Sequence, residues 1–357
     1  MLVQNNVPLQ AYNSFHIVAK AQSLVRIASE DDLREVLQDP ALADEPKFVL
    51  GGGSNIVLTG DVKALVLKME IMGRRLVRED ERQVVIELGA GENWHEVVDW
   101  TLQQGWPGLE NLALIPGTMG AAPVQNIGAY GVELQDRFES LDAVDLSTGK
   151  ALTLNAAQCA FGYRDSVFKH DSAADVALGQ QAIGLKGRLA IVRVRLALPK
   201  VWKAELGYAD LQKRMQLENC SSPTPRQVFD WVCAIRRAKL PDPAEIGNAG
   251  SFFKNPTVTP EQCADIIGRD PAVVHYPLAN GHIKLAAAWL IDACGWRGKS
   301  MGQAGVYPHQ ALVLINRGAV DGADGATGGE VMMLARAIQT SVYERFGIML
   351  EPEPVVV

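Results

Sequence analysis

Residues 248–256, with sequence NAGSFFKNP, place the hydroxyl of Ser251 close in the chain to the amine of Lys254 and the amide of Asn255. A hydrolase nucleophile usually stands in G-x-S-x-G on a sharp strand-to-helix turn. Ala249 and Phe253 occupy the places of those two glycines, so this template fails. Taken alone, Ser251 is best explained as a turn serine that hydrogen-bonds local backbone.

A second candidate for chemistry is the glycine-rich sequence GGGSN at residues 51–55, which directly follows the short apolar stretch 47–50. Glycines after a strand let backbone amides approach a pyrophosphate. The dinucleotide fingerprint G-x-G-x-x-G would need a glycine where Ile56 stands, so a Rossmann motif is excluded. A different loop that binds a diphosphate is the favoured interpretation.

Residues 108–134 form the third candidate, because glycines, small apolar residues, Pro116 and Pro123 recur through them. Such a composition does not support an ordinary helix or strand. It suits a long, rigid loop whose bare backbone lies against a flat, charged ligand.

Alternating strands and helices must position these loops. A capped helix is expected over residues 29–38, a strand over 84–88 followed by a helix from 94 to 102, and a long strand over 189–198. Residues 141–154 predict a hairpin. Its turn contains the sequence TGK, which lacks the Ser or Thr and the first glycine of a Walker A motif.

The polar, proline-bearing segment 216–225 is a plausible domain connector. After it, helices are predicted to begin at Thr224 and Thr259, each with a proline next and a glutamine three residues on. A third helix is predicted over residues 331–346 from its apolar periodicity. A chain of 357 residues is long enough for two or three domains.

Composition restricts the class of protein. The net charge of −7 argues against a broad nucleic-acid surface, and no apolar run reaches the length of a membrane span. No secretory signal is visible at the N-terminus, so a cytoplasmic enzyme or binding protein is expected. The five cysteines are scattered and the histidines lack ligand spacing, which predicts reduced thiols and no metal site.

Segments spread over most of the chain point to one family. They are NSF at 13–15, GGGSN at 51–55, GAGENWHE at 89–96, IPGTMG at 115–120, NIGAYG at 126–131, FGYRDSVFK at 161–169, KLPDP at 239–243, GNAGSFFKNP at 247–256, KLAAAWLID at 284–292, QALVLIN at 310–316 and LEPE at 350–353. With them the sequence resembles the UDP-N-acetylenolpyruvoylglucosamine reductases, bacterial flavoenzymes that make UDP-N-acetylmuramate for peptidoglycan.

The resemblance implies an α+β chain with a vanillyl-alcohol-oxidase-like (PCMH-type) FAD-binding fold. Its two lobes are expected at residues 1–70 and 71–220, and a smaller α+β substrate-binding domain at 221–350, with the extreme C-terminus returning to the active site. It further implies noncovalent FAD, NADPH as hydride donor and UDP-N-acetylglucosamine enolpyruvate as the small-molecule substrate. Neither nucleic acid, nor a membrane, nor an obligatory protein partner is expected.

Three residues match the family's catalytic positions. The resemblance implies that Ser251 gives a proton to C2 after hydride reaches C3 of the enolpyruvyl ether. A hydroxyl is a weak acid, but an enolate is a strong base, and a neutral donor costs little to bury beside anions. By the same resemblance Arg164 grips the substrate carboxylate, for which a planar two-pronged donor is suited, and Glu353 helps to stabilise the enolate.

The resemblance also assigns binding residues. For FAD these are Gly51, Gly52, Gly53, Ser54, Asn55, Pro116, Gly117, Thr118, Gly120, Asn126, Ile127 and Gly128. For the substrate they are Tyr208, Lys239, Asn255, Tyr276 and Gln310, with Tyr208 similar to the substrate-covering tyrosine of one subtype. Pro354 follows LEPE, where the family often has a basic residue nearby.

Two alternatives remain at this point. Another flavin oxidoreductase of the same fold is possible, although residues 48–53, at the first glycine loop, contain no histidine for covalent attachment. A non-catalytic sensor of UDP-sugars is the other. Retention of Arg164, Ser251 and Glu353 together argues against the sensor, because a sensor needs phosphate contacts but no proton donor.

Overall fold

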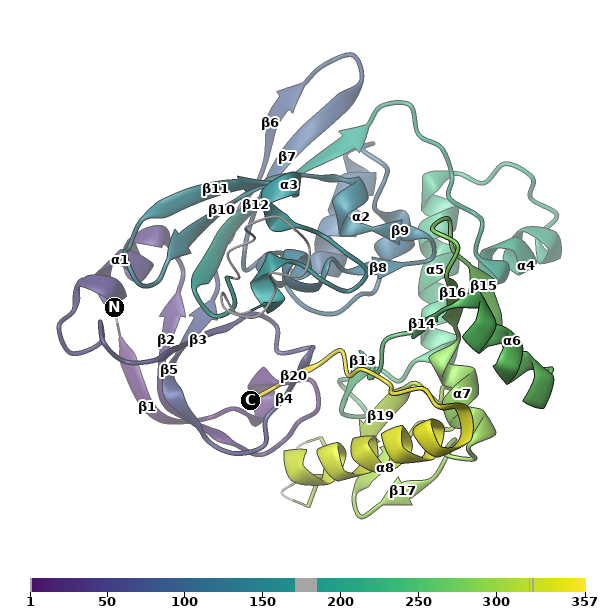
Figure 1. Cartoon of the computed structure of the whole chain (residues 1–357). Helices are drawn as coiled ribbons and strands as arrows, with labels where there is room; N and C mark the ends of the chain where they lie inside the picture. The colour runs from purple at the N-terminus through teal and green to yellow at the C-terminus, as the bar shows by residue number, and fades with distance from the viewer. Residues whose placement is uncertain (1, 171–184, 321, 323) are drawn as a thin grey trace. The chain divides into compact units, whose positions relative to one another are not determined.

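A computed structural model describes residues 2–170, 185–320, 322 and 324–357 (Figure 1). The chain forms two compact units. The first comprises Met1–Val7, Ala21–Gly52 and Lys63–Ala238, and the second comprises Pro8–Lys20, Gly53–Val62 and Lys239–Val357. The three-part division expected from the sequence stays a prediction.

One sheet of the first unit has four strands in the order β1-β2-β5-β3. The strands are β1 (Val3–Pro8), β2 (Lys20–Ile27), β5 (Val62–Met69) and β3 (Lys47–Leu50), and β3 runs parallel to β5. Helix α1 (Glu30–Gln38) follows β2, and Ser29 caps it in the expected capping box with Asp32. The predicted helix and the predicted strand at 47–50 are therefore confirmed.

The second sheet of this unit has five antiparallel strands in the order β11-β10-β12-β7-β6. They are β11 (Ala151–Asn155), β10 (Phe138–Asp145), β12 (Leu189–Pro199), β7 (Gln83–Gly89) and β6 (Arg74–Glu79). The pair β10 and β11 is the predicted hairpin, and its turn includes Gly149 at φ +68°. This conformation is natural for glycine and confirms that TGK is a turn.

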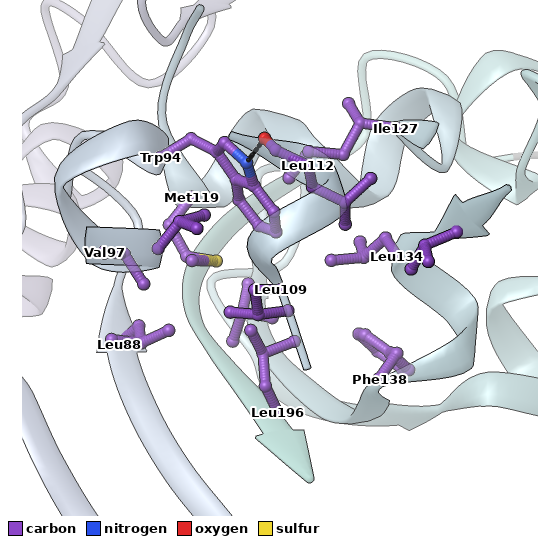
Figure 2. Close-up of a cluster of buried hydrophobic side chains, with 14 of the residues drawn as sticks. Leu88, Trp94, Val97, Leu109, Leu112, Met119, Ile127, Leu134, Phe138 and Leu196 are labelled. Atoms are coloured by element: carbon purple, nitrogen blue, oxygen red, sulfur yellow. Dashed lines mark hydrogen bonds between the residues drawn. The ribbon is translucent and has the colours of Figure 1, made fainter. Parts of the chain in front are cut away.

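The main hydrophobic core of the first unit lies among β7, β12 and two helices, α2 (Trp94–Gln103) and α5 (Pro225–Lys239). Figure 2 shows Trp94 within this cluster, with its indole nitrogen donating to the carbonyl of Leu112 at 2.8 Å. The bond satisfies the one polar atom of a large buried side chain. It also ties the start of α2 to the glycine-rich segment that follows.

That glycine-rich segment contains only short elements, as its composition predicts. They are the 3-10 helices η2 (Glu110–Leu112), η3 (Met119–Gln125) and η4 (Leu134–Asp136) and the two-stranded pair β8 (Gly128–Ala129) and β9 (Val132–Glu133). Beyond it lie α3 (Ala156–Cys159), η5 (Val167–Lys169) and α4 (Ala209–Leu217).

The second unit contains a four-stranded sheet in the order β13-β19-β18-β17 and a three-stranded sheet in the order β14-β16-β15. The strands are β13 (Asn248–Ser251), β19 (Val313–Asn316), β18 (Ala304–Val306), β17 (Ser300–Met301), β14 (Thr257–Val258), β16 (Ile283–Leu285) and β15 (His275–Pro277). The short strand β20 (Val355–Val356) pairs with β4 (Ile56–Val57), so the end of the chain lies beside the segment after GGGSN (Figure 1).

Three longer helices and the 3-10 turn η1 (Gln10–Tyr12) complete this unit: α6 (Pro260–Arg269), α7 (Ala287–Ala293) and α8 (Gly328–Phe346). Thr259 caps α6 as predicted. Helix α8 begins three residues earlier than expected, because Thr327 and Glu330 form a capping box before the apolar pattern starts.

Candidate active site

The two glycine loops of the first unit pack backbone against backbone. A Cβ added to Gly52 would lie 2.8 Å from the Cα of Gly117, and one added to Gly51 would lie 2.7 Å from Oγ1 of Thr118. Both approaches are too close for any larger residue, so glycine is required there. Oγ1 of Thr118 is buried without a hydrogen-bond partner, which leaves a polar atom for a ligand to satisfy.

The remaining residues of GGGSN belong to the second unit. Gly53 adopts φ +63°, and its carbonyl accepts from the amide of Ser14 at 3.0 Å. The side-chain amide of Asn55 donates to the carbonyl of Glu353 at 3.2 Å, and the carbonyl of Asn55 accepts from Val355 at 3.0 Å. The expected cofactor loop is thus bound directly to the C-terminal segment that carries a predicted catalytic residue.

Asn126 has a structural function in the NIGAYG segment. It is fully buried with φ +45°, and its amide nitrogen donates to Glu133 and to the carbonyl of Gly162, each at 2.9 Å. Its amide oxygen accepts from the backbone of Gln135 at 3.0 Å. Hydrogen bonds within the chain therefore satisfy both polar atoms of the Asn126 side chain. FAD is left only the backbone of Asn126 to contact.

Arg164 is held against the bare backbone of the same segment. Its Nη2 donates to the carbonyl of Gly128 at 2.5 Å, and a Cβ added to Gly128 would lie 2.9 Å from Nη1. Its guanidinium also lies 5.5 Å from the ring centroid of Tyr163. Arg164 itself adopts φ +55°, which is costly for a residue with a long side chain. The resulting geometry fixes the guanidinium next to the proposed FAD loop.

Within the second unit, the segment that carries Glu353 pairs with the segment that carries Ser251. Ser251 ends β13, and the next residue, Phe252, donates its amide to Leu312 and accepts from the amide of Glu353 at 2.9 Å. The amide of Lys254 bonds the carbonyl of Glu351 at 2.9 Å in the same short ladder. Glu353 is only 8% exposed.

Two buried rings anchor this ladder. Phe252 packs edge-on against Phe15 with centroids 6.3 Å apart, and against Phe253 with centroids 5.2 Å apart. Both phenylalanines of the ladder are almost completely buried. The two other rings pack against Phe252, so backbone bonds and ring packing hold the strand that carries the predicted proton donor.

The predicted substrate residues divide between the units. Tyr208 belongs to the first unit, where it is 49% exposed and its ring contacts Tyr130 at a centroid distance of 5.1 Å. Lys239, Asn255, Tyr276 and Gln310 belong to the second unit.

Within the second unit, Oδ1 of Asn255 accepts from the amide of Ala287 at 2.9 Å, at the start of α7. Gln310 lies two residues before Leu312, the partner of Phe252, so it is near Ser251 along the sheet. Tyr276 is exposed in β15, and Lys239 is exposed at the end of α5.

Comparison with known proteins finds two family models that match different parts of the chain. Residues 242–357 match the family model for the C-terminal domain of UDP-N-acetylenolpyruvoylglucosamine reductase, and residues 21–155 match an FAD binding domain. A UDP-N-acetylenolpyruvoylglucosamine reductase of Burkholderia orbicola is 53% identical over 350 residues, covering 98% of this chain and 95% of that protein. The chain belongs to the UDP-N-acetylenolpyruvoylglucosamine reductase family.

Two further reductases of this family also match the chain. That of Paraburkholderia xenovorans is 52% identical, with 98% of this chain and 96% of that protein covered. The crystal structure of the Thermus caldophilus reductase matches with a TM-score of 0.64 at 22% identity, over 100% of this chain and 99% of that chain. The expected family, the α+β fold and the FAD-binding class of the enzyme are confirmed.

The residues of this reductase fit FAD. Residues 51–52 and 117–118 approach each other too closely for side chains larger than glycine at 51 and 52, and a glycine backbone without side chains suits a diphosphate. The unpartnered hydroxyl of Thr118 lies in the same contact, inside the unit that contains the FAD-binding match. The individual FAD and substrate contacts, and the roles of Arg164, Ser251 and Glu353, stay predictions.

Metal and membrane features were expected to be absent. In the part of the chain that the structure describes, no three His, Cys, Asp or Glu side chains gather as metal ligands. Among the described residues no helix is both long and apolar enough to cross a membrane. All five cysteines are free, as their scattered spacing predicts.

Sequence reasoning missed Arg236 on α5. Helical spacing places this residue on the apolar face, because Arg236 follows the buried Val232 by four residues. Its neighbour Arg237 is exposed, as is usual for an arginine.

Proposed function

We propose that this chain catalyses the NADPH-dependent reduction of UDP-N-acetylglucosamine enolpyruvate to UDP-N-acetylmuramate, a step of peptidoglycan synthesis, in the cytoplasm. Its membership of the reductase family supports the overall reaction. The structural observation that supports the proposal is the backbone bond from Glu353 to Phe252, the residue after Ser251. A protein that only binds UDP-sugars would need the phosphate contacts but no proton donor.

When bound, FAD would supply the redox chemistry, which is hydride transfer from NADPH to C3 of the enolpyruvyl group. Hydride addition leaves negative charge at C2 and on the carboxylate, and side chains of the protein must stabilise it. Arg164, held by Gly128, binds the carboxylate as a two-pronged donor. Glu353, as a neutral acid, donates a hydrogen bond that stabilises the enolate, and Ser251 gives its proton to C2.

The rest of the substrate is assigned to the polar side chains that the family resemblance implies for binding. The cationic amine of Lys239 suits phosphate as a point charge. Asn255, Tyr276 and Gln310 contact the uridine diphosphate moiety, and the exposed ring of Tyr208 covers the bound substrate. Small molecules are the only partners that the reaction needs.

The direct test uses the purified full chain. FAD should copurify and give flavin absorbance, NADPH should bleach it, and the enolpyruvyl sugar nucleotide should restore the colour with stoichiometric formation of UDP-N-acetylmuramate. A colourless protein that binds UDP-sugars would instead identify a sensor. Bleaching without recovery by this substrate would identify an oxidoreductase of different specificity.

A further inference from the structure

Hydrogen bonds join the start of α2 to the glycine-rich segment. The amide of Trp94 donates to the carbonyl of Gly117 at 3.1 Å, and its indole nitrogen donates to the carbonyl of Leu112 at 2.8 Å. Between these two points in the chain, the amide of Leu114 donates to Nδ1 of His95 at 3.1 Å. A titratable side chain therefore holds the stretch that leads into the expected FAD loop.

The backbone of Leu114 needs such a restraint. It adopts φ +56°, in the left-handed region that residues with a Cβ rarely occupy. Residues persist in this region where the surrounding structure fixes them, and they cluster near functional sites. The bond to His95 and the packing of the Leu114 side chain against the main core both fix it. Because Leu114 directly precedes residues 115–118, its conformation sets the direction in which that loop leaves the core.

The bond to Leu114 defines the protonation state of His95. A backbone N–H can only donate, so Nδ1 must present its lone pair, and the proton of the neutral ring is on Nε2. An imidazolium has protons on both nitrogens and cannot accept this bond. The ring is also stacked on Phe229 of α5, with centroids 5.4 Å apart and an interplanar angle of 8°, which restricts its rotation.

The charged groups near His95 come from the two helices that pack here. They are Glu96 and Asp99 on α2, and Arg226, Arg236 and Arg237 on α5. Burial is the largest influence and lowers the pKa of His95; Arg236 and Arg237 also lower it, whereas the two carboxylates raise it. Since the usual pKa of a histidine is about 6.5, the neutral ring that accepts from Leu114 is the form present at pH 7.

We propose that His95 is a positioning residue for FAD, whose neutral ring holds Leu114 and the loop 115–118 in place and whose protonation releases that loop. Thr118 of this loop has a buried hydroxyl without a partner, which a ligand could satisfy. The inference rests on the proposed function, because FAD is expected to contact this loop. Its consequence is that FAD affinity falls as the pH drops below about 6.5.

The test is the dissociation constant of FAD, measured from flavin fluorescence when the full-length holoprotein is diluted. His95→Leu removes the acceptor and should weaken FAD binding roughly fivefold to fiftyfold near neutral pH, the effect of leaving an amide without its acceptor. His95→Asn places an uncharged oxygen close to the position of Nδ1, so its FAD affinity should stay within about threefold of the wild type.

The same measurement at about pH 8 and about pH 5 separates positioning from packing, because the asparagine cannot titrate. Over this range the wild type should lose roughly tenfold more affinity than His95→Asn. His282→Asn, at an exposed histidine, should follow the wild type. Deuterium exchange of the peptide that contains Leu114 gives a second readout, and exchange should be faster in His95→Leu than in His95→Asn at the same pH.

If His95→Leu does not purify as a folded protein, the pH dependence of the wild type and His95→Asn decides the question. Equal pH dependence of FAD affinity in these two proteins overturns the proposal. Lower thermal stability of the variants with unchanged FAD affinity also overturns it, and assigns His95 to the packing of α2 on α5. A wild-type chain that binds no FAD defeats the proposed function as well, whereas FAD binding with equal pH dependence defeats this inference alone.

Discussion

The amide of Glu353 donates to the carbonyl of Phe252 at 2.9 Å, and this bond joins the end of the chain to the residue after Ser251. It lies in a ladder with the bond from Lys254 to Glu351 and with the pairing of Phe253 and Pro352. Since every one of these contacts uses backbone atoms, side-chain substitutions in the ladder should alter chemistry without releasing the strand.

Ser251→Ala should separate the two half-reactions. NADPH should still bleach the flavin at close to the wild-type rate, while reoxidation by substrate slows roughly 10²–10⁴-fold, the usual effect of losing a general acid. Stopped-flow absorbance of the flavin measures both phases. Ser221→Ala, at an exposed serine, is the control. Slow bleaching with fast reoxidation would show that Ser251 has a different role.

Substitutions of Glu353 should lower turnover in a graded order. Glu353→Gln keeps a hydrogen-bond donor and should retain part of the activity, whereas Glu353→Ala should lower kcat by roughly 10²–10³-fold, as for loss of a donor to developing negative charge. The control is Glu351→Ala, which removes only a partly exposed ion pair with Lys254 and should change kcat little. Equal activity of the two alanine variants would remove Glu353 from the mechanism.

Gly52→Ala tests the contact between the two glycine loops. The added methyl would meet the backbone of Gly117 at 2.8 Å, so the loops must move apart. Overpacking of this kind costs about 1–3 kcal/mol, and we expect FAD affinity to fall roughly tenfold to hundredfold in a fluorescence titration. Gly60→Ala is a matched control because nothing lies within 4 Å of its added Cβ. FAD affinity equal in both variants would contradict a cofactor function for this loop.

Local signals in the sequence predicted much of the fold. Ser29 with Asp32 and Thr259 with Gln262 mark helix starts that the structure reproduces, because capping depends on residues three apart. The start of α8 was missed, since glycines at 328 and 329 disfavour a helix. Gly328 is there for packing, as an added Cβ would lie 2.0 Å from the carbonyl of Leu58.

The site was less visible in the sequence. The bond that joins Phe252 to Glu353 connects segments far apart in the chain, and no local pattern specifies such a pairing. Similarly, the hydrogen bonds of Asn126 within its own segment were not foreseen, and a family motif alone favoured a cofactor contact. Arg236 was overlooked because most arginines are exposed, although its place on the apolar face of α5 was readable.

Lowering the pH should destabilise the hairpin of β10 and β11, because it protonates the carboxylate of Asp145. Burial alone would raise the pKa of this carboxyl, but hydrogen bonds from Ser147 and Arg188 together outweigh burial and lower the pKa to about 2. Because the pKa is lower in the folded state than the value of about 3.9 in an unfolded chain, the carboxylate stabilises the fold above about pH 4. That stabilisation, about 2 kcal/mol at most, is lost as the pH falls from about 4 to about 2.

Asp145→Asn should therefore reduce the free energy of unfolding at pH 7 and flatten its decline below pH 4, measured by urea denaturation at a series of pH values. The control is Asp44→Asn, at an exposed aspartate outside this hairpin, which should follow the wild-type curve. If Asp145→Asn and the wild type lose stability in parallel between pH 4 and pH 2, the bonds to Ser147 and Arg188 are not what stabilises the ionised form.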